Sequence, residues 1–176
     1  RVWNSKKRFK VLLAGRRFGK TVLSLAWLIN RAATGPNHSV NWYIAPNYQM
    51  AKNIAWRQLK QMLANHPVKT NESELTIELG NGALIQLKSG ENPDSLRGPS
   101  LYSVVLDEAG FMSKEVWMDA ISPATSDQEA PVIFISSPPI SFNWFTDLYL
   151  SAKDDPDFAD DWDAFQYSTL EGGNVS

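Results

Sequence analysis

The sequence predicts an α/β domain whose central sheet is mostly parallel and carries helices on both faces. Two observations lead to this fold class. Strand-like apolar runs alternate with helix-like segments along the chain, and the length of 176 residues is enough for one domain with a real core. Strands separated by helices pair in parallel through right-handed crossovers, so the alternation predicts a layered sheet.

The first part of the chain supplies two strands and two helices. Residues 9–14 form a short apolar run that ends in a Gly-rich turn, as expected for a buried strand. Residues 20–33 are apolar on most faces and are followed by a Gly-Pro pair, so they should form a helix. Residues 40–45 predict a second strand, and residues 48–64 a second helix that ends before a proline.

An added β-hairpin is expected next. Between residues 74 and 88, apolar residues alternate with polar ones on both sides of Asn81 and Gly82. An Asn-Gly pair readily supplies the two positive φ angles of a type I′ turn, so these residues predict two antiparallel strands joined by that turn.

The rest of the chain returns to the alternating pattern. Residues 101–106 form a buried-strand run, and residues 114–121 predict a helix. Residues 132–135 predict a strand, residues 142–152 a helix and residues 165–169 the last strand.

Composition excludes several classes of function. There is no cysteine, which excludes disulfides, thiolate metal sites and cysteine nucleophiles. No apolar run approaches the roughly 20 residues that span a bilayer, and no secretory signal is apparent, so we expect neither a membrane partner nor secretion. A net charge of −2 and a pI near 5.7 argue against tight, static DNA binding by this domain alone. These values do not exclude transient contacts between a ring of subunits and the DNA backbone.

Residues 14–21 have the parts of a Walker A phosphate-binding loop. A strand leads into the loop, and the following helix directs its N-terminus at the phosphates. Lys20 would reach the β- and γ-phosphates and Thr21 would bind Mg²⁺, although Ala14 stands where the pattern begins with glycine. The predicted nucleotide-binding residues are Gly15, Arg16, Arg17, Phe18, Gly19, Lys20 and Thr21. On this motif alone, a helix that merely begins with Gly-Lys-Thr remains an alternative.

A second motif favours the nucleotide site. Residues 104–108 read as a buried strand that ends in Asp107 and Glu108. At the carboxyl edge of a parallel sheet, Asp107 would hold Mg²⁺ through water, and Glu108 would orient and deprotonate the attacking water. Strand alternation predicts that the two carboxylates point in opposite directions. The alternative is an acidic strand end that caps a helix near Ser113.

The glutamate beside the Walker B aspartate also indicates the type of enzyme. It predicts a P-loop ATPase of the RecA-like, additional-strand catalytic-glutamate type, in which a glutamate at the end of the Walker B strand activates water. Motors and helicases belong to this branch. Arg16 and Arg17 inside the loop are candidates to stabilise charge on the γ-phosphate, since arginine binds phosphate with a two-donor fork. The alternative is that one of them pairs with a carboxylate at the rim of the loop.

Taken in order, segments along essentially the whole chain resemble the ATPase domain of the large terminase subunit of tailed bacteriophages. The segments that carry the resemblance are residues 15–21 (Gly-Arg-Arg-Phe-Gly-Lys-Thr), 43–49 (Tyr-Ile-Ala-Pro-Asn-Tyr-Gln), 95–98 (Ser-Leu-Arg-Gly), 104–108, 134–138 (Phe-Ile-Ser-Ser-Pro), 143–145 (Asn-Trp-Phe) and 171–174 (Glu-Gly-Gly-Asn).

The resemblance implies ATP hydrolysis that drives double-stranded viral DNA into a procapsid. It implies partners as well: other copies of the chain in a ring, the portal and the small terminase subunit. Arg16 matches the family's in-loop arginine, and Arg97 is similar to an arginine that acts on the neighbouring subunit. Ser136 and Ser137 resemble the coupling motif that senses the γ-phosphate. Arg97 could instead bind a loop carbonyl, and the serines could cap a helix.

The resemblance also predicts the domain organisation. We expect residues 1–170 to form the ATPase domain and residues 171–176 to begin a linker, with the family's nuclease domain absent from this chain. The segment that contacts adenine should lie before Arg1. Residues 139–141 (Pro-Ile-Ser) lack the basic residue expected after the coupling motif. The expected location is the host cytoplasm, with transient binding at the portal vertex.

Two other functions remain open. One is a RecA-like half of a helicase, which would normally need a second such domain. The other is a scaffold that binds nucleotide without hydrolysing it, which an intact Glu108 disfavours.

Overall fold

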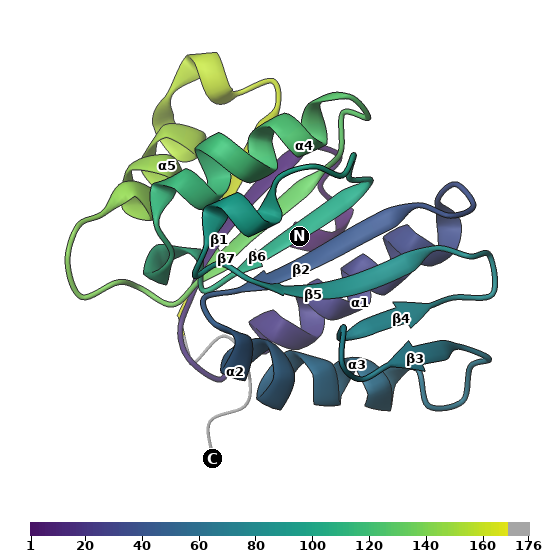
Figure 1. Cartoon of the computed structure of the whole chain (residues 1–176). Coiled ribbons are helices and arrows are strands. Elements are labelled where there is room, and N and C mark those ends of the chain that lie inside the picture. The colour runs from purple at the N-terminus through teal and green to yellow at the C-terminus, as the bar shows by residue number, and fades with distance from the viewer. Residues whose placement is uncertain (169–176) are drawn as a thin grey trace.

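One eight-stranded sheet organises the chain (Figure 1). The structure is a computed structural model, and it describes residues 1–168. The strands lie in the order β3-β4-β5-β2-β6-β7-β1-β8. Their bounds are β1 Phe9–Ala14, β2 Val40–Ala45, β3 Lys69–Asn71, β4 Thr76–Glu78, β5 Leu84–Ser89, β6 Ser103–Asp107, β7 Val132–Ser136 and β8 Trp162–Tyr167. All pairs from β5 to β8 are parallel, whereas β3 and β4 add antiparallel pairs, so the predicted α/β class is confirmed.

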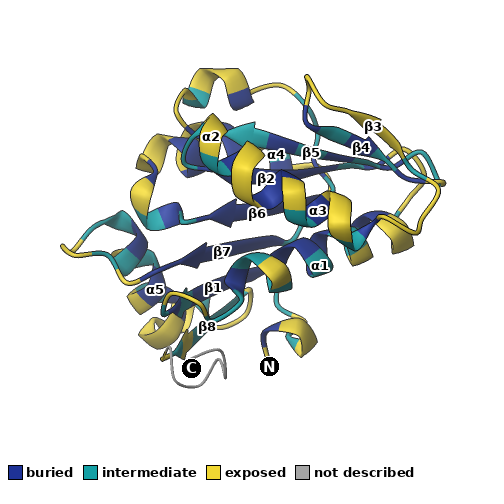
Figure 2. Ribbon diagram, turned by 90° about the horizontal axis from the view of Figure 1, so that it is seen from below, coloured by how far each residue is buried: buried dark blue, intermediate teal, exposed yellow. Residues whose placement is uncertain are grey.

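Helices cover both faces of this sheet (Figures 1 and 2). On one face lie α1 (Lys20–Thr34), α2 (Tyr48–Met50) and α3 (Arg57–Met62), and on the other lie α4 (Ser122–Ser126) and α5 (Trp144–Asp154). Short 3-10 helices span Val2–Asn4, Pro93–Leu96, Ala109–Phe111 and Pro156–Phe158. None of the helices within residues 1–168 combines the length and the apolar character that a membrane crossing requires.

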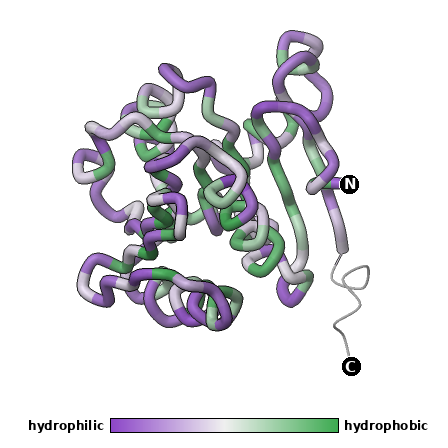
Figure 3. Tube along the Cα trace, turned by 90° about the vertical axis from the view of Figure 1, so that its right-hand side faces the viewer, coloured by the Kyte–Doolittle hydropathy of each residue, from purple (hydrophilic) through white to green (hydrophobic). Residues whose placement is uncertain are grey.

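Each face of the sheet has its own apolar core. Leu25 and Leu28 of α1 are fully buried against one face, and Phe145 of α5 against the other. Burying one such side chain stabilises the fold by about 1.5–3 kcal/mol. Every residue of β6 is buried, because helices cover both of its faces. The hydrophilic stretches instead gather at the outer turns (Figure 3).

Two predicted helices contain wider π-helical turns that periodicity did not reveal. The helix expected over residues 48–64 runs from α2 through a π-helix, Ala51–Trp56, into α3. The helix expected over residues 114–121 contains a π-helix, Val116–Ile121, and continues through α4. Pro123 lies just after the junction at which the π-helix passes into α4, and the helix continues through it to Ser126.

The hairpin of β4 and β5 is present, but the prediction of a type I′ turn was wrong. Of the Asn-Gly pair, only Gly82 has a positive φ, at 77°. The Gly82 N–H donates to the Leu79 carbonyl at 2.9 Å, which makes a three-residue loop of residues 80–82. Asn81 turns instead toward α1, and its Nδ2 donates to the Ala32 carbonyl at 2.9 Å. This tertiary contact is not visible in the local sequence.

Two further differences concern strands at the edges. The edge strand β3 was not predicted, because all three of its residues are exposed and show no apolar alternation. Strand β8 begins at Trp162, before the predicted start at residue 165. The predicted linker at residues 171–176 lies outside the described residues.

Candidate nucleotide site

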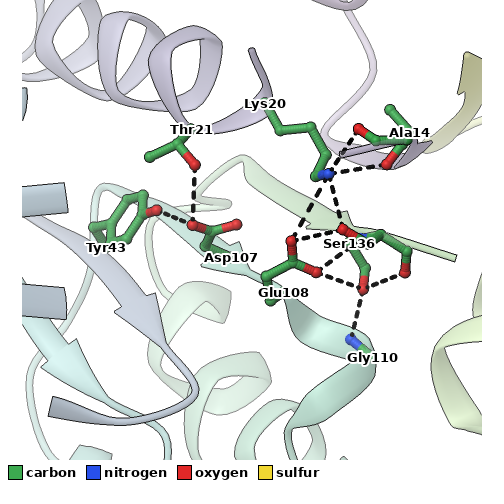
Figure 4. A network of polar contacts seen from close by, with 10 residues as sticks. Ala14, Lys20, Thr21, Tyr43, Asp107, Glu108, Gly110 and Ser136 are labelled. Carbon is green, nitrogen blue, oxygen red and sulfur yellow. Dashed lines mark hydrogen bonds and ion pairs between the residues drawn. The ribbon is translucent and has the colours of Figure 1, made fainter. Parts of the chain in front are cut away.

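The carboxyl ends of the parallel strands bring the predicted site residues to one edge of the sheet. The register pairs Leu13 of β1 with Ser136 of β7, and Asp107 of β6 with Ile135 of β7. The loop after β1 therefore lies beside the ends of β6 and β7, and Figure 4 shows their side chains converging. This edge is where open α/β sheets bind ligands.

The loop between β1 and α1 is shaped by left-handed backbone conformations. Gly19, which precedes α1, has a φ of 93°, and Arg17 has a φ of 62°. Arg16 and Arg17 are exposed on this loop. A cavity of about 230 Å³ is lined by the following residues: Arg16, Arg17, Phe18, Gly19, Lys20, Thr21, Val22, Gln58, Glu108 and Ser137. The N-terminus of the 15-residue helix α1 lies at this cavity, so its free N–H groups favour an anion there.

The edge strand β8, which pairs with β1, supports this loop. The Gly15 N–H donates to the carbonyl of Tyr167 in β8 at 3.2 Å. The ring of Phe18 stacks on the ring of Tyr167, with centroids 4.8 Å apart. The position of β8 therefore helps to set the shape of the loop.

Lys20 is buried with its ammonium group inside the site (Figure 4). Its Nζ donates to the carbonyls of Ala14 at 2.9 Å and Gly15 at 3.1 Å, and to Ser137 Oγ at 3.1 Å. Glu108 Oε1 lies 3.7 Å away. The ammonium group of Lys20 therefore bonds to carbonyl oxygens of its own loop. An anion bound in the cavity would compete with these carbonyls for the ammonium group.

Asp107 lies in a buried pocket with Thr21 and Tyr43. Its Oδ2 accepts hydrogen bonds from the Tyr43 hydroxyl and from Thr21 Oγ1, the latter at 3.4 Å. Burial raises the pKa of Asp107 from 3.8 to about 6, and burial together with the neighbouring Asp107 raises the pKa of Tyr43 well above its usual value.

The pair formed by Thr21 and Asp107 fits a magnesium ion. Asp107 Oδ1 is buried and has no hydrogen-bond partner, so this oxygen is available as a ligand for a cation. No group of three or more His, Cys, Asp or Glu side chains that could hold a metal ion occurs in residues 1–168. Mg²⁺ needs no such cluster, because it is commonly held by one or two protein oxygens together with phosphate and water.

Glu108 leaves the strand in a left-handed conformation, with φ 49° and ψ 44°. Its carboxylate accepts hydrogen bonds from the Ser137 N–H at 2.8 Å, from Ser137 Oγ at 2.9 Å and from Ser136 Oγ at 3.3 Å. Asp107 and Glu108 therefore have separate partners, as strand alternation predicts, but it is the backbone turn at Glu108 that directs the second carboxylate toward β7.

Arg97 is not part of this cavity. It follows the 3-10 helix Pro93–Leu96, is exposed, and pairs through Nε with Asp94 Oδ1 at 3.1 Å. It lines a different cavity of about 280 Å³, near Asp119 and Asp127.

Sequence reasoning missed the contact of Tyr43 with Asp107. The tyrosine is fully buried in β2, which lies beside β6. One signal in the sequence could have indicated this contact. A tyrosine on a buried strand usually forms a hydrogen bond through its hydroxyl group. Which partner it has depends on the neighbour of β2 in the sheet, and the sequence alone did not supply that neighbour.

Comparison with known proteins adds to this geometry. Residues 11–173 match a family described as terminase large subunit, T4likevirus-type, N-terminal. The large terminase subunits of Thermus phage G20c and Thermus virus P23-45 are each 28% identical over 169 residues, which cover 85% of this chain and 34% of theirs. The chain thus spans about a third of the length of these relatives.

Two solved structures show the same fold. The large terminase ATPase domain of Thermus phage P74-26 superposes with a TM-score of 0.78 at 23% identity, covering 96% of this chain and 80% of that one. The large terminase of another thermophilic bacteriophage, in complex with ADP, gives a TM-score of 0.81 at 20% identity, covering 99% of this chain and 45% of that one. At this identity the likeness shows the fold.

Proposed function

The chain belongs to the terminase large-subunit family, and from that premise we propose that it is the ATP-hydrolysing domain of a viral DNA-packaging motor. One observation carries the proposal: Lys20, Glu108 and Ser137 line a single cavity at the N-terminus of α1, with Thr21 and Asp107 beside them. This arrangement supplies a cation for phosphate, a carboxylate for water and oxygen ligands for magnesium.

Each side chain has a step that its geometry supports. Lys20 exchanges the carbonyls of Ala14 and Gly15 for the β- and γ-phosphates of ATP. Thr21 and Asp107 would hold a Mg²⁺ ion, which would supply positive charge against the phosphates. Glu108 orients the attacking water and accepts its proton.

The coupling serines and the arginines complete the proposal. Ser136 and Ser137 hold Glu108 and would respond to the γ-phosphate through it. Arg16 stabilises the charge that develops on the transferred phosphoryl group, from the rim of the cavity. Arg97 serves the site of a neighbouring copy, because it is exposed and lies outside the cavity of its own chain.

The wider assembly follows from the family. We propose residues 1–170 as the ATPase domain and residues 171–176 as the start of a linker, with double-stranded DNA, further copies in a ring, the portal and the small terminase subunit as partners. The place of action would be the procapsid portal in the host cytoplasm.

Phosphate release from Mg·ATP tests the proposal. The wild-type chain should release phosphate, and Lys20→Ala should not, because the charge that faces the phosphates is lost. Lys153→Ala, an exposed lysine of α5, is the matched control and should behave as the wild type. A wild type that binds ATP without releasing phosphate, even with duplex DNA and in the full-length assembly, would instead support a nucleotide-binding scaffold.

A further inference from the structure

A second cavity lies at the opposite edge of the sheet. It has a volume of about 470 Å³ and lies between the 3-10 helix Val2–Asn4, the start of β1, the second half of α1 and residues 129–131. Its lining includes five cationic side chains: Lys6, Lys7, Arg8, Lys10 and Arg31. In a chain of net charge −2, this is a marked local concentration of positive charge.

None of these five cations forms an ion pair within residues 1–168. Lys7 Nζ donates to the Ala159 carbonyl at 2.7 Å, and Arg8 Nη2 donates to the Thr125 carbonyl at 2.9 Å. Carbonyl oxygens fix the two side chains in place but do not neutralise their charge. Lys6 is exposed at the rim of the cavity.

Two of the cations lie deeper in the fold. Lys10 is only 4% exposed, and its Nζ donates to the Lys7 carbonyl at 3.0 Å. Burial and the nearby positive charge of Arg31 lower the pKa of Lys10. Arg31 packs its guanidinium over the ring of Tyr102, 4.6 Å from the centroid, and its Nε is buried without a hydrogen-bond partner. A buried donor without a partner is unfavourable, so an acceptor at this place would stabilise the protein.

The acidic groups nearby are too few to balance this charge. Glu129 lines the cavity, and Asp163 acts on Lys10 from β8. Asp163 Oδ2 already accepts a hydrogen bond from Ser5 Oγ at 2.5 Å. Among the lining residues Glu129 alone is acidic, and Asp163 acts on Lys10 from outside the lining, so an excess of positive charge remains.

We propose that this cavity binds a phosphate group, either a phosphodiester of a DNA backbone or free inorganic phosphate or pyrophosphate. A guanidinium fork and several ammonium groups are the donors that proteins use for this anion. The site is separate from the nucleotide cavity, because the two lie at opposite ends of the six-residue strand β1, roughly 15–20 Å apart at about 3.3 Å per residue. It therefore does not depend on the proposed ATPase function.

Binding measurements in a Lys20→Ala background test the inference, since this substitution removes phosphate binding at the nucleotide site. Lys6→Ala is the principal variant, because an exposed side chain can be removed without loss of packing, and Arg31→Gln is the second. Pyrophosphate binding is measured by calorimetry, and duplex DNA binding by fluorescence anisotropy over a range of salt. Lys153→Ala removes one positive charge elsewhere and is the matched control.

The expected result is a loss of at least several-fold in affinity for one of the two ligands with Lys6→Ala and with Arg31→Gln, and no change with Lys153→Ala. If DNA is the source, the dependence of log affinity on log salt becomes shallower by about one for each cation removed. If free phosphate is the source, only pyrophosphate binding falls. Unchanged binding of both ligands in both variants, or an equal loss with Lys153→Ala, would overturn the inference.

Discussion

Ser137 holds the carboxylate of Glu108 with both of its donors, its N–H 2.8 Å from Oε2 and its hydroxyl 2.9 Å from Oε1. A carboxylate bound at both oxygens has a fixed orientation, so the end of β7 determines where Glu108 points. The hydroxyl of Ser137 also accepts a hydrogen bond from Lys20 Nζ at 3.1 Å. One serine thus connects the proposed phosphate-binding lysine with the proposed general base.

Ser137→Ala should lower turnover by about tenfold or more while ATP affinity stays within several-fold, because the variant loses the hydroxyl that orients Glu108 but keeps the backbone N–H. Steady-state phosphate release and calorimetry on the same preparation measure the two effects. Ser141→Ala, an exposed serine of the following loop, should match the wild type. Normal turnover by Ser137→Ala would show that the backbone N–H alone positions the carboxylate.

Asp107→Asn should stabilise the protein above pH 6 in the absence of Mg²⁺. The folded-state pKa of Asp107 is about 6, above its usual 3.8, so the fold disfavours the ionised form. The wild type therefore loses stability as the pH rises from about 4 through 6, and Asn, which does not ionise, avoids this loss. At pH 8 the gain in unfolding free energy should be about 1–3 kcal/mol, and at about pH 4 it should disappear.

Urea denaturation with a chelator present, from pH 4 to pH 8, measures this difference. The same Asn variant should lose magnesium-dependent turnover, since it removes the charge that faces the cation. An Asp107→Asn protein that is less stable than the wild type at pH 8 would mean that the ionised carboxylate is better solvated than its burial indicates.

Arg16 and Arg17 should differ in their effect on catalysis. If Arg16 stabilises the charge that develops on the γ-phosphate, Arg16→Ala lowers turnover by about 100-fold or more and leaves ATP affinity within several-fold. Arg16→Lys restores little, because an ammonium group lacks the two-donor fork. Arg17→Ala should affect ATP binding or stability more than turnover if Arg17 pairs with a carboxylate at the rim of the loop. Steady-state ATP hydrolysis by the assembled full-length protein, compared across the three variants, distinguishes the two arginines. Low turnover by Arg17→Ala together with normal turnover by Arg16→Ala would reverse the proposed roles.

Arg97→Ala should leave ATP binding by the isolated chain unchanged but lower turnover of the assembled motor, because the arginine lies outside the cavity of its own chain. Mixing Arg97→Ala subunits with Glu108→Gln subunits provides the sharper test. If Arg97 acts on the neighbour, a mixed ring contains some sites with both groups intact and regains activity. Loss of ATP affinity in the isolated Arg97→Ala chain would contradict a role between subunits.

Local patterns predicted most of the elements because each depends on neighbours along the chain. The apolar run of β1 and the helix of α1 have nearly the predicted bounds. The turn at Gly82 was mispredicted because Asn81 does not take a positive φ; its side chain accepts from the Ala83 N–H and donates to the Ala32 carbonyl of α1, a tertiary contact that the local sequence does not show. The π-helical turns were missed because each is a short segment within a longer helix, and such turns are too rare to be expected from an apolar pattern.

The candidate site was predictable to the extent that its chemistry is contained in short motifs. Lys20, Thr21, Asp107 and Glu108 were each placed by such a motif, and the structure brings them to one edge of the sheet. The contact of Tyr43 with Asp107 depends on β2 lying beside β6, which no local pattern specifies. The basic cavity joins β1, α1 and residues 129–131, so it appears only after folding.

The division of labour between Lys20 and Glu108 is the central claim, and ATP binding compared with hydrolysis in two variants tests it most directly. Mg·ATP affinity is measured by calorimetry and phosphate release by a steady-state assay, for Lys20→Ala and Glu108→Gln. Lys20→Ala should lose both binding and turnover. Glu108→Gln should bind ATP as the wild type does and fail to hydrolyse it, because an amide can orient water but cannot accept its proton. Equal loss of ATP affinity in both variants, or normal hydrolysis by Glu108→Gln, would contradict the account.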